Sequence, residues 1–365
     1  MNPEDRRSML QSPSQGLKIG HVSRDDESND ASTSSSATTQ RPLFCCLPVR
    51  PSDPPYSAWN LYGPEDELGT LNLLTPTSTL AAAREVVTGT TIPLNLPLHL
   101  PSVPMNPARR PMEHRFLAKG HANDDEVTLN TQSSSQWDGL RHYPYQSFGS
   151  RGEPVFYNGA RQQDFVDEDG RCTEKLGVQN LARKGIVGRG VLLDWAGWAQ
   201  RQDRAWDPFS AHAIPLSELK AVAEEAGIEF HEADILLIRT GWTAAYLTLS
   251  MQERIRLAAR SQRSFIGVEA SEETFRWHWE CGFAAVASDT NAYEAQPFTK
   301  AANPAGVSCH EVFLSGWGMP IGELWDLEEL AKVCRERRKW TFMLSSCPLD
   351  VVGGVGSTSN AVAVL

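Results

Sequence analysis

Short apolar runs that alternate with amphipathic segments limit this chain to one class of fold. Three runs have the length and composition of buried strands, at residues 188–194, 234–240 and 284–287. Two amphipathic segments that each close on a glycine lie between them, at residues 215–227 and 271–282. Strands and helices in such alternation pack as a sheet with helices against it. The sequence therefore predicts an α/β fold.

The N-terminal part of the chain differs from the rest in composition. Residues 1–55 are poor in large apolar side chains, include a low-complexity patch rich in serine and threonine, and end in a group of prolines. We predict a disordered N-terminal tail over residues 1–55 and one folded domain over residues 56–365. Near the start of that domain, Thr75 followed by proline predicts a capped helix, and the prolines of residues 91–100 predict an edge strand.

A polar run from Asn130 to His142 carries the residues best suited to chemistry. If the run is extended, Gln132, Gln136 and Asp138 share one face, because strand side chains alternate with a period of two, and they would line a cavity. A solvated surface loop rich in serine and glutamine is the alternative. Asp138 and His142 end the run as an ionisable pair.

The polar run and four further segments are similar to the motifs of one protein family. The family signature reads H-x-G-T-H-x-D-x-P-x-H, and Asp138 and His142 match its aspartate and last histidine. The other segments resemble its W-G-x-x-D-E-x-G-T-L-N, G-D-x-V-L-I-R-T-G-W, G-V-x-x-x-G-x-D-T and P-L-x-x-x-G-x-x-G-S-P-x-R-A-V motifs, and they lie in family order at residues 59–75, 234–242, 284–290 and 348–364. On these motifs the chain resembles the metal-dependent cyclase family, which includes kynurenine formamidases and isatin hydrolases.

The resemblance implies a fold, an assembly and a site. The fold is the swivelling β/β/α fold with a barrel-like mixed sheet, and the assembly is a homodimer or homotetramer. The implied metal ligands are Asp138, His310 and Glu323, and His142 with Asp138 is the implied catalytic pair. A histidine with a pKa near 6.5 can both take and return a proton. The substrate is a small molecule.

The chain departs from the signature where Gln132 and Gln136 occupy the positions of two histidine ligands. A carboxamide oxygen is a weaker donor to a transition metal than imidazole, so we expect lowered affinity for zinc. The expected cofactor is a divalent metal, Mn, Zn or Mg. With no metal bound, Asp138 and His142 would act as an acid/base pair, and the two glutamines would donate hydrogen bonds to substrate oxygens.

Aromatic residues flank the run and suit an aromatic substrate. They either form the wall of a cavity or belong to the core, and the sequence leaves both open; they are Trp137, Tyr143, Tyr145 and Phe148. We predict substrate-binding roles for Trp137, Gln132, Gln136 and Tyr143. His99, His114 and His121 lie outside the signature and are weaker candidates for ligands.

Three functions are consistent with these residues. The first is a hydrolase resembling arylformamidase that cleaves a carbon–nitrogen bond of a formamide or cyclic amide, or a lactone bond, of an aromatic metabolite, as in the breakdown of tryptophan through kynurenine. The second is a metal-independent acid/base cyclase or dehydratase of secondary metabolism. The third is a non-catalytic binding protein that keeps the fold.

Composition excludes several other classes of protein. The 34 basic and 45 acidic residues give a net charge of -11, which disfavours nucleic acid and anionic membranes as partners. No apolar run is long enough to span a bilayer. Seven cysteines at irregular spacing predict reduced thiols and a cytoplasmic protein. No glycine-rich phosphate-binding motif follows a strand, so we expect no nucleotide cofactor.

Overall fold

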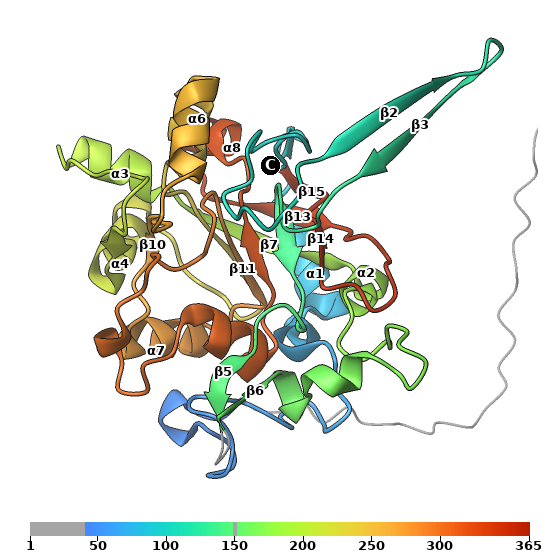
Figure 1. The fold of residues 1–365 in the computed structure, drawn as a ribbon. Helices are drawn as coiled ribbons and strands as arrows, with labels where there is room; N and C mark the ends of the chain where they lie inside the picture. The colour runs from blue at the N-terminus through green and yellow to red at the C-terminus, as the bar shows by residue number, and fades with distance from the viewer. Residues whose placement is uncertain (1–40, 149–151) are drawn as a thin grey trace, which may run out of the picture. The chain divides into compact units, whose positions relative to one another are not determined.

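The computed structural model describes residues 41–148 and 152–365, and its centre is a curled mixed sheet of nine strands (Figure 1). The strand order is β1-β15-β13-β7-β9-β11-β12-β4-β14. Neighbours from β7 to β12 are parallel, and all other neighbours are antiparallel. The strands are β1 Thr91–Pro93, β4 Gln136–Asp138, β7 Ile186–Leu193, β9 Ile235–Ile238, β11 Ala285–Ser288, β12 Ile321–Glu323, β13 Thr341–Ser346, β14 Gly356–Thr358 and β15 Ala361–Val364. The predicted α/β fold with a barrel-like mixed sheet is confirmed.

Three two-stranded sheets and the helices complete the described chain. The small sheets are β2 Glu113–Ala118 with β3 Asn123–Thr128, β5 Tyr145–Phe148 with β6 Glu153–Val155, and β8 Ala213–Ile214 with β10 Gly267–Val268. The helices are α1 Pro76–Ala83, α2 Gln179–Lys184, α3 Trp195–Arg201, α4 Leu216–Ala226, α5 Trp242–Thr248, α6 Met251–Ala258, α7 Glu272–Cys281 and α8 Glu328–Arg337, and a π-helix spans Glu311–Trp317. None of these helices is long and apolar enough to cross a bilayer.

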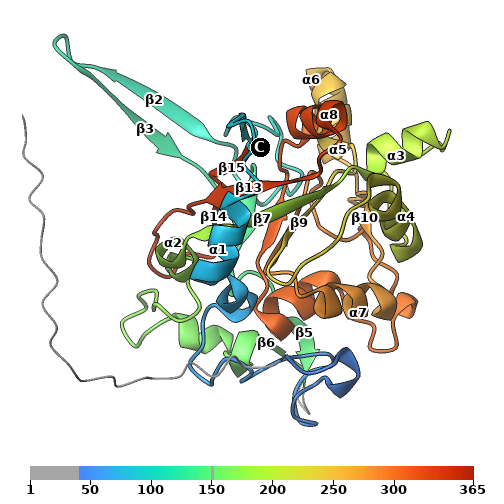
Figure 2. The same cartoon turned by 180° about the vertical axis from the view of Figure 1, so that it is seen from behind.

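Both faces of the central strands are buried, which explains their continuous apolar sequence. In β9, Leu236 and Ile238 join a core that includes Trp242 of α5 and Phe275 of α7. The alternate residues of β9 join a second core that includes Leu330 of α8. Figure 2 shows α1 lying across β7 and β13 on one side of the sheet. The sheet is therefore a layer between two apolar cores.

The predicted capping signals lie at the ends of the observed helices. Thr75 and Ser78 form a capping box, and Ser271 accepts a hydrogen bond from Thr274 at the start of α7. Gly227 and Gly282 take the left-handed conformation where α4 and α7 end. Of the edge strand predicted over residues 91–100, only β1 pairs regularly, and it does lie at the edge of the sheet.

The domain begins before residue 56, so the predicted boundary is too late. Phe44 is 2% exposed, and its ring stacks on Tyr56 with centroids 5.4 Å apart. The indole of Trp279 donates to the carbonyl of Pro42 at 2.8 Å. Aromatic burial at this one position outweighs the polar composition around it. Residues 1–40 of the predicted tail lie outside the described residues.

Candidate active site

Strand β4 places the signature residues at the centre of the site. It pairs with β12 on one side and β14 on the other, and Gln136 lies directly opposite Glu323. Only Gln136–Asp138 is extended, whereas residues 131–135 form turns and bends, so the predicted extended run is shorter than expected. Gln132 still reaches the site, because its side-chain oxygen accepts from the amide nitrogen of Gln136 at 2.6 Å.

The absence of a side chain at Gly356 makes room for Gln132. A Cβ at position 356 would lie 2.2 Å from the Gln132 amide nitrogen, so glycine leaves the space that the glutamine side chain fills.

Trp137 faces away from the site, so its predicted role in substrate binding is wrong. Its indole is fully buried in the second core, edge-on to Trp325 with centroids 4.9 Å apart, and donates to the hydroxyl of Ser346 at 2.9 Å. The alternation of a strand puts Trp137 on the opposite face from Gln136 and Asp138.

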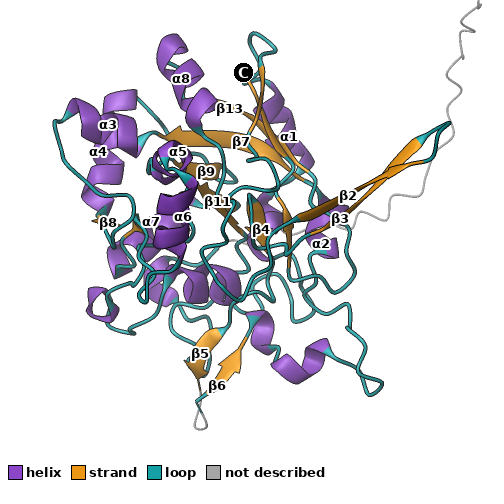
Figure 3. Cartoon of the chain, turned by 45° about the horizontal axis from the view of Figure 1, so that its top comes forward, coloured by secondary structure: helices purple, strands orange, loops and turns teal. Residues whose placement is uncertain are grey.

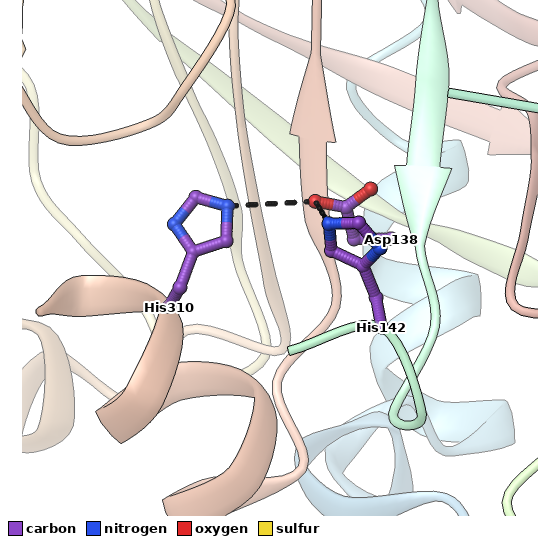
Figure 4. Close-up of side chains that lie close together, drawn as sticks. All are labelled: Asp138, His142 and His310. Carbon is purple, nitrogen blue, oxygen red and sulfur yellow. Dashed lines mark ion pairs between the residues drawn. The ribbon is translucent and has the colours of Figure 1, made fainter. Parts of the chain in front are cut away.

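Asp138, His142 and His310 converge (Figure 4). Oδ2 of Asp138 lies 3.8 Å from Nε2 of His142 and 3.6 Å from Nε2 of His310. The chain turns after β4, where the backbone amide of His142 donates to the carbonyl of Gly139 at 2.9 Å. This turn places the imidazole of His142 close to the end of the strand. His310 comes from the N-terminal end of the π-helix. Residues from two distant parts of the sequence thus share one carboxylate.

The carboxylate of Asp138 is fully buried, and its two oxygens differ. Oδ1 accepts from the Gln136 amide at 3.0 Å, whereas Oδ2 has no hydrogen-bond partner in the part of the chain that the structure describes. Burial opposes ionisation, but the nearby imidazoles of His142 and His310 lower the pKa of Asp138 below its ordinary value. Burial lowers the pKa of His142, and Asp138 opposes that shift.

Two further carboxylates surround His310. Its Nε2 lies 3.1 Å from Oε1 of Glu323, and its Nδ1 lies 2.8 Å from Oε2 of Glu294. Burial alone would lower the pKa of His310, but Glu294, Asp138 and Glu323 raise it well above its ordinary value. Burial and the neighbouring Asp138 raise the pKa of Glu323 to about 7. Sequence reasoning missed Glu294, because no motif singles it out and only the fold brings it to His310.

Gln136 joins the acidic groups to one another. Its amide nitrogen donates to Oε1 of Gln132, Oδ1 of Asp138 and Oε2 of Glu323, at 2.6, 3.0 and 2.9 Å. The side chain is fully buried beneath the site. Gln132 and Gln136 therefore support the two carboxylates, and their contact with substrate oxygens stays a prediction.

The donor atoms of Asp138, His142 and His310 fit a divalent cation. One carboxylate oxygen and two imidazole nitrogens lie within 4.8 Å of one another, and the unpaired Oδ2 of Asp138 is the acceptor that a cation would satisfy. The predicted ligand set had Glu323 in place of His142. In the structure Glu323 instead bonds to His310 and Gln136.

A cavity of about 570 Å³ opens above these residues. His142, Tyr143, His310 and Glu323 line it, together with Arg109, Asn291 and Glu294. The Asn291 side-chain nitrogen is buried without a partner among the described residues. A larger cavity of about 690 Å³, between α4 and the end of α8, contains none of the site residues.

The structure divides the flanking aromatic residues between wall and core. Tyr143 is on the wall of the cavity, with its ring 5.4 Å from that of His310. Tyr145 is buried in the core and donates to the carbonyl of Pro55 at 2.7 Å. His99 is exposed in a loop, and His114 and His121 lie in the exposed β2–β3 hairpin, away from the site.

Replacing Glu294 tests whether it positions His310. We expect Glu294→Ala to lower the turnover rate about 10- to 100-fold, because the imidazole loses the partner that fixes its orientation. Glu294→Gln keeps an acceptor for Nδ1 and should restore most of the rate. The measurement is steady-state turnover of both variants on a substrate that the wild type cleaves, with thermal melting to confirm folding. Equal loss in both variants would contradict a positioning role.

The fold and site define an α/β protein with a buried carboxylate between two histidines at the base of a metabolite-sized cavity. The chain belongs to the Cyclase family, whose model matches residues 62–295. The predicted family membership is thereby confirmed.

Solved structures agree with this assignment. A crystal structure of a novel cyclase is 29% identical in sequence, with a TM-score of 0.72, and the alignment covers 85% of this chain and 99% of that one. Isatin hydrolase A from Ralstonia solanacearum is 16% identical, with a TM-score of 0.51, covering 80% and 98%. Isatin hydrolase A from Labrenzia aggregata is also 16% identical, with a TM-score of 0.50 and the same coverage. At this identity the two hydrolases show a shared fold. No curated protein sequence matches the chain.

Proposed function

We propose that this chain is a hydrolase that opens an amide or lactone bond of a small aromatic metabolite, in the manner of an arylformamidase. The observation that carries the proposal is the carboxylate of Asp138 lying between two imidazoles at the base of a cavity of about 570 Å³. A cavity of that volume suits a metabolite rather than a polymer. Family membership supports the same class of chemistry.

His142 is the proposed proton acceptor. Its side chain is 17% exposed and lines the cavity, whereas Asp138 is 0% exposed. The imidazole takes a proton from the attacking water, and the buried carboxylate stabilises the imidazolium that forms. The same proton is then returned to the leaving nitrogen or oxygen.

Groups on the cavity wall provide the remaining binding functions. Asn291 has an unpaired amide donor that suits the oxygen on which negative charge develops during attack. Tyr143 presents an aromatic ring beside the reacting groups. Arg109 supplies a positive charge for a carboxylate on the substrate or product.

Asp138, His142 and His310 would hold a divalent cation, which when bound supplies a water of lowered pKa. Cation binding and proton acceptance exclude each other at Nε2 of His142, because both use the same lone pair. With a cation held there, Glu323, which also lines the cavity, is the proposed proton acceptor.

Metal content and hydrolysis measured together test the proposal. Purified full-length protein is analysed by plasma mass spectrometry and assayed on N-formylkynurenine, isatin and aromatic lactones, with and without a chelator. We expect turnover of at least one of these substrates, lost in His142→Ala and retained in Trp137→Phe. Absence of turnover on every substrate, with and without added Mn²⁺ or Zn²⁺, would overturn the proposal.

A second candidate is metal-independent acid/base chemistry, such as cyclisation or dehydration. The hydrogen bonds of Gln136 favour it, because they occupy carboxylate oxygens of Asp138 and Glu323 that a cation could otherwise use. Turnover that is unaffected by a chelator, in protein that contains no metal, is the result expected from this candidate.

A further inference from the structure

The cavity of about 690 Å³ between α4 and the end of α8 is a second place where a small molecule can bind. α3, α4 and α8 lie around the carboxyl end of β7 there (Figure 3). Val222 and Trp340 line the cavity with apolar surface, whereas six of its ten lining residues are charged. A ligand in this cavity has to satisfy charges as well as cover an aromatic ring.

Most of these charges have no hydrogen-bond partner inside the cavity. Arg201 and Glu225 pair with each other at 2.9 Å. The other four charged side chains form no hydrogen bond with one another, and they are Asp194, Glu224, Arg335 and Arg338. Within residues 41–148 and 152–365, the side chains of Glu224 and Arg338 have neither a hydrogen bond nor an ion pair. Two positive and two negative groups are therefore available to a ligand.

Asp194 is the buried member of this set, with 1% of its surface exposed. Its Oδ1 accepts from Arg239 at 2.7 Å and from the backbone amide of Gly197 at 3.0 Å, whereas Oδ2 accepts no hydrogen bond from any described residue. Nη2 of Arg335 lies 3.6 Å from Oδ2, which is too far for a hydrogen bond. A buried carboxylate oxygen without a donor is costly, so a donor on a ligand would stabilise it.

We propose that this cavity binds an aromatic α-amino acid in its zwitterionic form. The ammonium group donates to Oδ2 of Asp194, and the carboxylate accepts from Arg335 and Arg338. The Arg335 side chain is 53% exposed and can turn from Asp194 to the ligand. The aromatic side chain packs on Trp340 and Val222.

The spacing of the charges selects an α-amino acid. Its ammonium and carboxylate are attached to the same carbon, and the opposite charges of Asp194 and Arg335 are only 3.6 Å apart. An aromatic acid without an ammonium group would leave Oδ2 of Asp194 unpaired. An aromatic amine without a carboxylate would lie between two guanidinium groups with nothing to offer them. Only a ligand of both signs satisfies the whole set.

This cavity is separate from the candidate active site. The two cavities share no lining residue, so binding does not depend on the proposed hydrolysis and is measured without turnover. The active-site cavity contains an arginine of its own, Arg109, which could also attract a carboxylate. An experiment must therefore establish both the class of ligand and the place where it binds.

The first test compares three ligands by isothermal titration calorimetry of the full-length protein. L-Phenylalanine should show saturable binding. 3-Phenylpropionate lacks the ammonium group and 2-phenylethylamine lacks the carboxylate, so each should bind at least about tenfold more weakly, because one set of charges stays unpaired. Equal affinity for all three ligands, or no saturable binding of L-phenylalanine at millimolar concentration, would overturn the proposal.

The second test locates the site with three variants, each checked for folding by thermal melting. Arg338→Ala should weaken binding of L-phenylalanine at least about tenfold, since the carboxylate loses a guanidinium. Arg337→Ala is the matched control, because the neighbouring Arg337 lies outside the cavity and donates to the hydroxyl of Thr90 at 2.8 Å. Arg109→Ala alters the active-site cavity, and both it and Arg337→Ala should leave the affinity unchanged.

Three results of the second test would contradict the proposed site. Undiminished binding in Arg338→Ala would exclude its guanidinium from the contact. Equal loss in Arg337→Ala and Arg338→Ala would show a general effect of surface charge. Loss in Arg109→Ala would place the ligand in the active-site cavity instead.

Discussion

Asp138→Asn is expected to lower kcat/KM by about 10²- to 10⁴-fold, the range that positioned acid/base groups contribute. Asparagine has the same shape and keeps Oδ1 as the acceptor for Gln136, so the fold should survive. The uncharged amide cannot stabilise an imidazolium at His142, and it is a poor ligand for a cation between His142 and His310. Steady-state kinetics on the substrate found by the screen above measure the effect.

The neighbouring residue provides the control for that experiment. Trp137→Phe removes the hydrogen bond to Ser346 on the opposite face of β4 and should lower stability while kcat/KM changes little. If Trp137→Phe reduced kcat/KM as much as Asp138→Asn, the loss would reflect damage to β4 rather than chemistry at the carboxylate.

Asp289→Ala is expected to lower the free energy of unfolding by about 3 kcal/mol or more, because it leaves several buried donors unpaired. The carboxylate accepts from the backbone amide and hydroxyl of Thr240 at 2.6 and 2.7 Å, and from the amide of Gly241 at 2.8 Å. These bonds join the end of β11 to the turn that starts α5. Burial raises the pKa of Asp289 to about 6, so the donors only partly offset the cost of burying its charge. Urea denaturation at pH 7 measures the change.

A surface aspartate that accepts one backbone hydrogen bond is the control. Asp207 is exposed and accepts from the amide of Phe209 at 2.9 Å in a turn. Asp207→Ala should cost no more than about 1 kcal/mol, because water replaces the lost bond. If both substitutions lowered the free energy of unfolding equally, the buried hydrogen bonds of Asp289 would stabilise the fold no more than the exposed bond of Asp207.

Local signals in the sequence determined the secondary structure well. Ser271 and Gly282 predicted both ends of α7, because capping depends on residues within one turn of the helix. The apolar run at 234–240 predicted β9, since a strand buried on both faces has no polar alternation. The family motifs predicted the fold class. The signature motif, in which Asp138 and His142 are four residues apart, predicted the ionisable pair.

Only the tertiary structure decided which side chains meet in the site. Trp137 and Asp138 are neighbours in sequence, yet pairing with β12 and β14 directs one into the core and the other under the cavity. The family resemblance had placed Glu323 near His310, but Glu294 reaches His310 only through the fold, and no local pattern encodes that contact. The sequence by itself determined the elements and the ionisable pair, because caps, strand burial and short spacings act over a few residues. The fold decided the carboxylate network, because its hydrogen bonds join residues as far apart as Gln136 and Glu323.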